Sequence, residues 1–141
     1  MNNQDIRKAV ENILENSSVG TLATIQQDRP YSRYMTYTHE GLTLFTATSS
    51  ETHKVEEIES NPYTHILLGY EGDGFGDEYV EYQGKVKISD SEDLKKKLWN
   101  PYMENWFDGP NDPNYIILEI QPFEIKLMNK KGQDPKVLEF E

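Results

Sequence analysis

Residues 19–47 read VGTLATIQQDRPYSRYMTYTHEGLTLFTA, and this stretch decides the fold. Three of its segments are rich in β-branched and aromatic residues, which favour strands: 19–25, 31–38 and 42–47. The residues between them, Asp28-Arg29-Pro30 and His39-Glu40-Gly41, have the composition of tight turns. Three strands joined by such short turns predict an antiparallel meander, because parallel neighbours need a longer crossover.

Helical patterns flank this meander. Before it, residues 4–16 carry apolar side chains at helical spacing, and Asn3 is the expected cap. After it, Thr48-Ser49-Ser50-Glu51 fits a capping box, in which a glutamate follows a threonine by three residues. A second helix is therefore predicted to begin at this box and to end near Asn61-Pro62.

The rest of the chain adds one helix and four strands. Ser89-Asp90-Ser91-Glu92 opens the helix, which runs toward Trp99 and is interrupted or restarted at Pro101. The strand patterns cover residues 63–70, 78–88, 115–121 and 123–128. The last dozen residues are polar and are predicted to be loose. Six or seven strands without a strand–helix alternation indicate a mainly β fold, an antiparallel β-barrel with accessory helices. We expect a single domain over residues 1–141, with its core in 4–128.

The composition limits the expected partners. The chain has 141 residues, a net charge of −11 and no cysteine. Such an acidic chain repels phosphate backbones and anionic membranes, so neither a nucleic acid nor a membrane is an expected partner. The lack of cysteine excludes disulfides and thiolate metal sites. Without an apolar signal segment or a membrane-length apolar run, the expected location is the cytoplasm.

The junction between the third strand and the second helix is the strongest candidate for a binding site. Within residues 45–50, Thr48, Ser49 and Ser50 bring three hydroxyl groups to a predicted helix N-terminus, where backbone N–H groups and the helix dipole favour anions. Lys54 lies one turn further, and Arg33 lies on the neighbouring strand. Together these groups would form a phosphate clamp. The alternative is a plain capped helix, with Lys54 solvated and Arg33 paired to a carboxylate.

Other patterns that can bind ligands are incomplete. Residues 71–78 are acidic and glycine-rich, but a calcium loop there would place Phe75 and Tyr82 where oxygen ligands are needed. We therefore interpret this segment as a hairpin loop. The three histidines lack metal-ligand spacing, so no metal site is predicted. The paired carboxylates Glu56 and Glu57 are interpreted as a solvated helix face.

An aromatic cluster follows the third helix and consists of Trp99, Tyr102, Trp106 and Phe107. Such side chains pack in a core or at a dimer interface, or they contact the ring of a ligand. Both roles are compatible in a groove between two subunits. The sequence has no nucleophile elbow and no Ser-His-acid order, and it assigns no catalytic residue.

Several of these segments together resemble the pyridoxamine 5′-phosphate oxidase-like flavoproteins. Residues 19–24 and 29–35 are similar to the opening of those proteins, and 45–49 and 53–55 follow in the same order and spacing. Residues 106–113, WFDGPNDP, are similar to a segment of the general stress protein 26 branch. The resemblance spans residues 5–125.

The resemblance implies an FMN-binding split barrel that forms a homodimer, with FMN, or alternatively FAD, in a groove between the subunits. It implies that Arg33 and Lys54 contact the phosphate and that Thr48 and Ser49 donate hydrogen bonds to the phosphate or the ribityl chain. From its place beside Lys54, His53 would touch the flavin or a substrate, or it would be a plain helix-surface residue. The residues implied to border the isoalloxazine ring are Tyr34, Met35, Thr46, Ala47 and, from the other subunit, Trp106.

The implied activity is that of a flavin-dependent oxidoreductase with a reduced nicotinamide as electron donor. Pyridoxamine phosphate oxidases proper carry an Arg-x-His element near the C-terminus, and none follows Tyr115 here. Oxidation of pyridoxamine phosphate is therefore not expected. Two alternatives remain open, a non-catalytic flavin-binding stress protein and the same fold with FAD, a deazaflavin or haem as its ligand.

Overall fold

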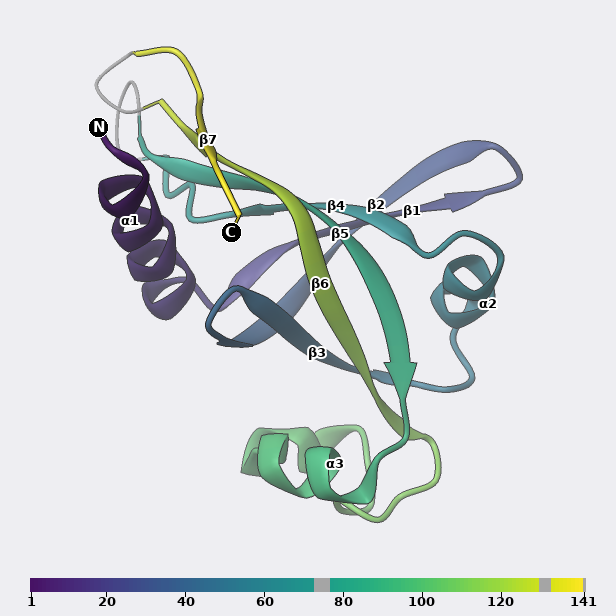
Figure 1. The fold of residues 1–141 in the computed structure, drawn as a ribbon. Coiled ribbons are helices and arrows are strands. Elements are labelled where there is room, and N and C mark those ends of the chain that lie inside the picture. Colours follow the sequence, from purple (N-terminus) through teal and green to yellow (C-terminus); the bar gives the residue numbers. More distant parts are fainter. Residues whose placement is uncertain (73–76, 130–132, 141) are drawn as a thin grey trace.

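The computed structural model describes residues 1–72, 77–129 and 133–140, and seven strands dominate this part of the chain (Figure 1). The strands are β1 (Val19–Gln26), β2 (Arg29–Glu40), β3 (Thr43–Ser49), β4 (Tyr63–Leu68), β5 (Tyr79–Ser89), β6 (Tyr115–Met128) and β7 (Lys136–Leu138). The helices are α1 (Asn3–Asn16), α2 (His53–Ser60), α3 (Glu92–Leu98) and a 3-10 turn, η1 (Pro101–Asn105). In this part of the chain, no helix has the length and apolar composition needed to cross a membrane.

The strands form one antiparallel sheet that closes on itself. Its order is β3-β2-β1-β4-β5-β6-β7, and an additional pairing of β3 with β6 closes β1 to β6 into a barrel. The meander predicted over residues 19–47 is confirmed, since β1 pairs with β2 and β2 with β3. The predicted mainly β barrel with accessory helices is therefore correct. Figure 1 shows the β1–β2 hairpin extending past the rest of the sheet, with α2 near its base, α1 on the other side of the molecule and α3 at the bottom of the view.

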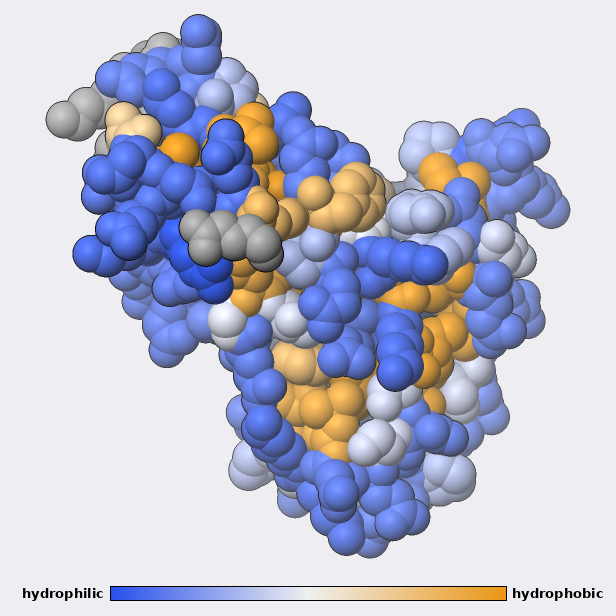
Figure 2. Space-filling model, viewed as in Figure 1, coloured by the Kyte–Doolittle hydropathy of each residue, from blue (hydrophilic) through white to orange (hydrophobic). Residues whose placement is uncertain are grey.

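Apolar residues that alternate along the strands fill two cores. The larger core lies inside the barrel and includes Leu22, Ile66 and Ile120, each fully buried, with Val10 of α1 against it. The smaller one joins β3 and β6 to the α3 segment through Phe45 and other side chains. Figure 2 shows hydrophobic residues reaching the surface in the middle of the molecule, flanked by hydrophilic residues. The smaller core matters for function because it holds the α3 segment against the site described below.

The second helix begins later than the sequence indicated. Thr48 and Ser49 belong to β3, α2 starts at His53, and Thr52 is its N-cap without a side-chain capping bond. The capping-box prediction was wrong because Thr48 pairs with Ile116 of β6, and this ladder carries the strand through the hydroxyl-rich stretch. The hydroxyl groups therefore lie at the end of a strand, four to five residues before the helix.

The C-terminal region also differs from the prediction. Residues 115–128 form one strand rather than two, because a bulge at Gln83/Gly84 accommodates Pro122 without breaking the ladder. The tail is not loose throughout, since β7 pairs with β6 and buries Leu138. Pro101 does restart the third helix, as the 3-10 turn η1. Most of the predicted 71–78 loop lies outside the described residues.

Candidate functional site

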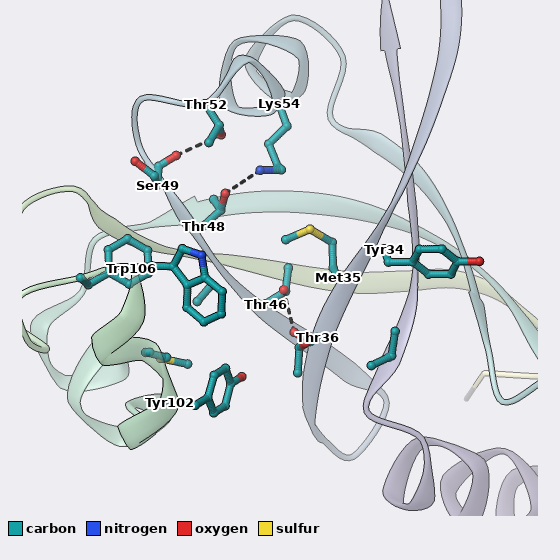
Figure 3. A pocket seen from close by; sticks show the side chains of 14 residues that line it. Tyr34, Met35, Thr36, Thr46, Thr48, Ser49, Thr52, Lys54, Tyr102 and Trp106 are labelled. Carbon is teal, nitrogen blue, oxygen red and sulfur yellow. Dashed lines mark hydrogen bonds between the residues drawn. The ribbon is translucent and has the colours of Figure 1, made fainter.

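A cavity of about 450 Å³ lies between the end of β3, the start of α2 and the η1 turn (Figure 3). Its size is in the range of small-molecule and cofactor sites. Residues from five elements and the loops beside them line it: Val19, Tyr34, Met35, Thr36, Thr46, Ala47, Thr48, Ser49, Thr52, Lys54, Tyr102, Met103, Trp106 and Phe107.

One end of the cavity carries a single lysine and several hydroxyl groups. The Lys54 ammonium donates a hydrogen bond to the Thr48 hydroxyl over 2.8 Å. The Thr52 hydroxyl donates to the Ser49 carbonyl over 3.0 Å, which fixes the turn between β3 and α2 (Figure 3). A cation with hydroxyl donors beside a helix start is a suitable place for an anionic group.

The environment of Lys54 disfavours its charged form. Burial lowers the pKa of Lys54 below its ordinary value of 10.5, the nearby Arg33 charge lowers it further, and the Glu57 carboxylate opposes both effects. An ammonium with a lowered pKa gains more from a nearby anion than a solvated one does, because the anion offsets the unfavourable burial. Arg33 is linked to the helix of Lys54 by its ion pair with Glu57, which follows Lys54 by three residues.

Arg33 lies next to the cavity but does not line it. Its guanidinium donates to the Thr24 hydroxyl over 2.6 Å and to the Leu22 carbonyl over 3.3 Å. It also forms an ion pair with Glu57 of α2 over 3.1 Å. Glu57 is 8% exposed, so the interpretation of this residue as part of a solvated face was wrong. The carboxylate is buried because it has a cationic partner on β2 and a hydroxyl partner on β1.

The opposite end of the cavity is aromatic and apolar. Trp106 and Tyr102 stand edge to face with ring centroids 6.3 Å apart, and Trp106 remains 69% exposed. The Thr46 hydroxyl donates to the Thr36 carbonyl over 2.7 Å, so this hydroxyl is engaged within the β2–β3 strand pair (Figure 3). A flat slot with aromatic walls and an open side suits a planar ring.

The aromatic wall is held by contacts to β6. Tyr115 of β6 donates its hydroxyl to the Lys95 carbonyl over 2.9 Å, and the Lys95 ammonium donates to the Asp112 carbonyl over 3.3 Å. The rings of Trp99 and Phe107 pack on Tyr115 at 5.4 and 5.1 Å. The predicted aromatic cluster thus divides: Trp99 and Phe107 pack against the smaller core, and Phe107 also lines the cavity with Tyr102 and Trp106.

The structure brings together eight of the ten residues that the sequence pointed to. Those that line the cavity are Tyr34, Met35, Thr46, Ala47, Thr48, Ser49, Lys54 and Trp106. Arg33 lies behind this lining, and His53 points to solvent with its side chain 87% exposed. The Tyr34 ring, 79% exposed, points away from Lys54 and Trp106 (Figure 3). Trp106, implied to come from another subunit, lines the cavity of its own chain.

Sequence reasoning missed several lining residues and one neighbour. Thr36 lies on a strand already assigned to the site and Val19 lies on the neighbouring strand β1, and strand alternation alone could not place them at the cavity. Met103 lies on the η1 turn, and only the folded structure shows that this turn lies beside β3. Glu57 had a usable signal, because it follows Lys54 by three residues and therefore shares its helix face.

Comparison with known proteins gives close matches over nearly the whole chain. The sequence model of the family described as pyridoxamine 5′-phosphate oxidase matches residues 6–129. General stress protein 26 of Bacillus subtilis (strain 168) is 56% identical over 139 residues, 99% of this chain and 99% of that protein. The crystal structure of General Stress Protein 26 from Bacillus anthracis str. Sterne has a TM-score of 0.84 and 33% identity, over 95% of this chain and 98% of that one.

Two more distant solved structures share the fold alone. An FAD-binding protein from Mesorhizobium loti has a TM-score of 0.71 and 18% identity, over 86% of this chain and 92% of that one. A haem-binding protein from Mycobacterium smegmatis has a TM-score of 0.76 and 15% identity, over 93% of this chain and 57% of that one.

Proposed function

Because this chain belongs to the pyridoxamine 5′-phosphate oxidase family, we propose that it binds FMN in the cavity and acts in the cytoplasm as a flavin-dependent oxidoreductase of the general stress response. One observation carries the proposal: a single cavity is lined by the Lys54 ammonium and, on another side, by the Trp106 indole (Figure 3). FMN has the same division, with an anionic phosphate at one end and a planar, partly apolar ring at the other.

At the charged end, Lys54 would bind the phosphate directly. The hydroxyls of Thr48 and Ser49 would donate to the phosphate or to the ribityl chain, since both residues line this part of the cavity. Arg33 would add a second positive charge from behind Lys54 and would direct toward the phosphate the guanidinium N–H donors that Leu22, Thr24 and Glu57 leave free. A cation pair of this kind is typical of phosphate recognition.

At the apolar end, Met35, Thr46 and Ala47 would form the floor under the ring, and Trp106 would stand beside it. His53 would contact only the part of the ligand that extends toward solvent, because its side chain points outward. When bound, FMN supplies the electron-transfer chemistry, and the chain's contribution is to bind and orient the ring.

We also propose that the protein is a homodimer whose second subunit covers the cavity. Val19 and Tyr34 are 55% and 79% exposed, and they line both this cavity and an adjoining one of about 440 Å³. Leu67 and Tyr70, also exposed, line the second cavity. Apolar and aromatic side chains gathered around two adjoining hollows favour burial by a second copy.

A non-catalytic flavin-binding role is the second candidate. Among the described residues that line the cavity there is no histidine, aspartate or glutamate, so the chain offers no carboxylate or imidazole there as a general acid or base. A cavity lined in this way suits a protein that binds the cofactor and leaves electron transfer to the cofactor alone. It also suits a protein that only sequesters or senses flavin.

FAD is the second candidate ligand, because a protein of this fold from another bacterium is FAD-binding. A deazaflavin would fit the same slot, whereas haem would need an axial ligand. Among the described residues that line the cavity, those with a suitable donor atom are Tyr34, Met35, Tyr102 and Met103.

Mass spectrometry of the ligand released from the purified protein tests the proposal. The expected result is FMN in about one copy per chain, together with a flavin absorption spectrum. Release of haem, or no binding of added FMN or FAD, would contradict it. Oxidation of a reduced nicotinamide by the FMN-loaded protein would support the oxidoreductase, and its absence with tight FMN binding would support the sequestering role.

A further inference from the structure

The two cations near the proposed phosphate site come from different elements, and one carboxylate connects them. Arg33 lies on β2 and Lys54 on α2. Glu57 follows Lys54 by three residues on the same helix and forms an ion pair with Arg33 over 3.1 Å. The position of the Arg33 guanidinium relative to the Lys54 ammonium is therefore set through Glu57.

A threonine completes this arrangement. The Thr24 hydroxyl donates to the Glu57 carboxylate over 2.5 Å and accepts from the Arg33 guanidinium over 2.6 Å. Thr24 is 1% exposed and Glu57 is 8% exposed. Three side chains from β1, β2 and α2 thus form a closed set of hydrogen bonds, which holds the guanidinium in one orientation.

The charge balance of the cluster favours the same conclusion. Arg33 and Lys54 carry like charges and lie close enough for one to disfavour the charged form of the other, while Glu57 opposes that effect. A buried carboxylate without a partner is strongly disfavoured, so α2 packs on the sheet most stably with Arg33 in this orientation. Contacts within the chain therefore hold the second cation in place.

We propose that Glu57 is a positioning residue, which acts through Arg33 to preorganise the site for the ligand phosphate. The inference rests on the proposed function. A long arginine side chain that is already ordered loses less conformational entropy when it binds an anion, so its contact contributes more to affinity. Glu57 itself does not line the cavity, and its effect reaches the ligand through the guanidinium.

The rival role for Glu57 is purely structural, a tie between α2 and the sheet. The two roles differ in which ligands they affect. A structural tie supports the whole cavity, so its loss weakens every flavin equally. A positioning role affects only ligands that carry the phosphate, so comparison of FMN with riboflavin separates the two.

The test measures the dissociation constants of FMN and riboflavin for Glu57→Ala, Glu57→Gln and the matched control Glu56→Ala. Glu56 lies on the same helix with its side chain 84% exposed, and its substitution changes the net charge equally. For Glu57→Ala we expect FMN to bind about tenfold more weakly and riboflavin to change less than about threefold. Glu57→Gln keeps an oxygen that accepts from Arg33, so it should stay within about threefold of the wild type for both ligands.

The result for Glu57→Ala is diagnostic because the substitution removes a negative charge near the proposed phosphate position. Electrostatics alone would then strengthen FMN binding. Equal weakening of both ligands, or stronger binding of FMN, would overturn the positioning role. If Glu57→Ala does not fold, Thr24→Val removes the bridging hydroxyl at similar volume. A wild-type ratio of the FMN and riboflavin affinities in that variant would likewise overturn the inference.

Failure of the proposed function has a different signature. If the wild-type protein binds neither flavin, or binds riboflavin as tightly as FMN, the phosphate site itself is wrong. A wild-type protein that prefers FMN, with a Glu57→Ala variant of unchanged preference, would contradict the inference on Glu57 alone.

Discussion

Lys54 is the residue on which the proposed ligand site depends most directly. Its ammonium lines the cavity and contacts Thr48, whereas Arg33 is committed to Glu57 and Thr24. Removal of Arg33 would leave the buried Glu57 carboxylate without its cation, at a cost of about 3–5 kcal/mol in stability. Substitution of Lys54 therefore tests ligand binding more directly, whereas substitution of Arg33 mainly changes the stability of the fold.

We predict that Lys54→Ala weakens FMN binding at least about tenfold, because a charge-assisted hydrogen bond to the phosphate contributes roughly 1.5–3 kcal/mol. Riboflavin binding and the thermal unfolding temperature should change little. Calorimetric titration measures both affinities, with Lys8→Ala on the exposed face of α1 as the control for charge. Unchanged FMN affinity in Lys54→Ala would place the phosphate elsewhere.

FMN affinity should also depend on pH through Lys54. The pKa of Lys54 in the empty protein lies below 10.5 because of burial and the Arg33 charge. As pH rises through this lowered pKa, the ammonium loses its proton and FMN binding should weaken. Binding in this alkaline range should take up a proton, because the phosphate raises the pKa again.

Titrations in buffers of different ionisation enthalpy measure that proton uptake. It should disappear in Lys54→Ala and should not occur with riboflavin. The lowered pKa of Lys54 also makes the free energy of unfolding increase with pH in the alkaline range. The unfolded chain binds more protons between the lowered pKa and 10.5, so the cost of burying charged Lys54 is full at lower pH and is relieved as pH rises through that window.

At this scale the sequence predicted most of the lining but not the charge network. Residues at the strand–helix junction, such as Thr48 and Lys54, could be identified because this junction is contiguous along the chain. The Glu57 contact joins residues 24 positions apart in sequence. The contact forms only because the barrel brings β2 beside α2, and no local sequence pattern indicates this pairing of elements.

At the scale of elements, the C-terminal strand β7 closes the end of the barrel near α1. Leu138 is 3% exposed, and β7 pairs with β6 in the register Ile125↔Leu138. The Asn3 side chain donates to the Glu139 carbonyl over 3.0 Å and accepts from the Glu139 N–H over 2.8 Å, which ties this strand to α1.

We expect Leu138→Ala to lower the free energy of unfolding by about 2 kcal/mol, near the lower limit for buried leucines because the strand is short and at an edge. Urea denaturation measures the change. Val137, which is 49% exposed on the opposite face of the strand, provides the control Val137→Ala. Equal effects of the two substitutions would show that β7 does not bury Leu138 in solution.

The predictions of elements succeeded where residue type and spacing agreed with the final pairing. The meander over residues 19–47 is an example. They failed where pairing overrode local preference, since the β3–β6 ladder extends a strand through the capping-box residues. The Pro122 interruption was misjudged because only the partner strand shows the bulge that tolerates it. A three-residue strand such as β7 is too short for any periodicity to indicate it.

At the scale of the whole molecule, the proposed dimer accounts for the exposed side chains around the cavity. Val19 is 55% exposed and lines both adjoining cavities. The net charge of −11 opposes association, so the apolar contact must outweigh that repulsion.

We predict that the protein sediments as a dimer at micromolar concentration and that Val19→Asp shifts it toward monomer, because the substitution buries a charge at the contact. Analytical ultracentrifugation at moderate salt measures both. Ile25→Asp on the extended β1–β2 hairpin adds the same charge outside the two cavities and is the control. A wild-type monomer throughout the concentration range would contradict the dimer and leave the cavity open to solvent.

The most direct measurement is a crystal structure of the protein with FMN bound. The account predicts that a phosphate oxygen lies about 3 Å from the Lys54 ammonium, that the ring lies against Met35 and Trp106, and that a second subunit covers it. A phosphate remote from Lys54, or a ring outside this cavity, would contradict the central claim.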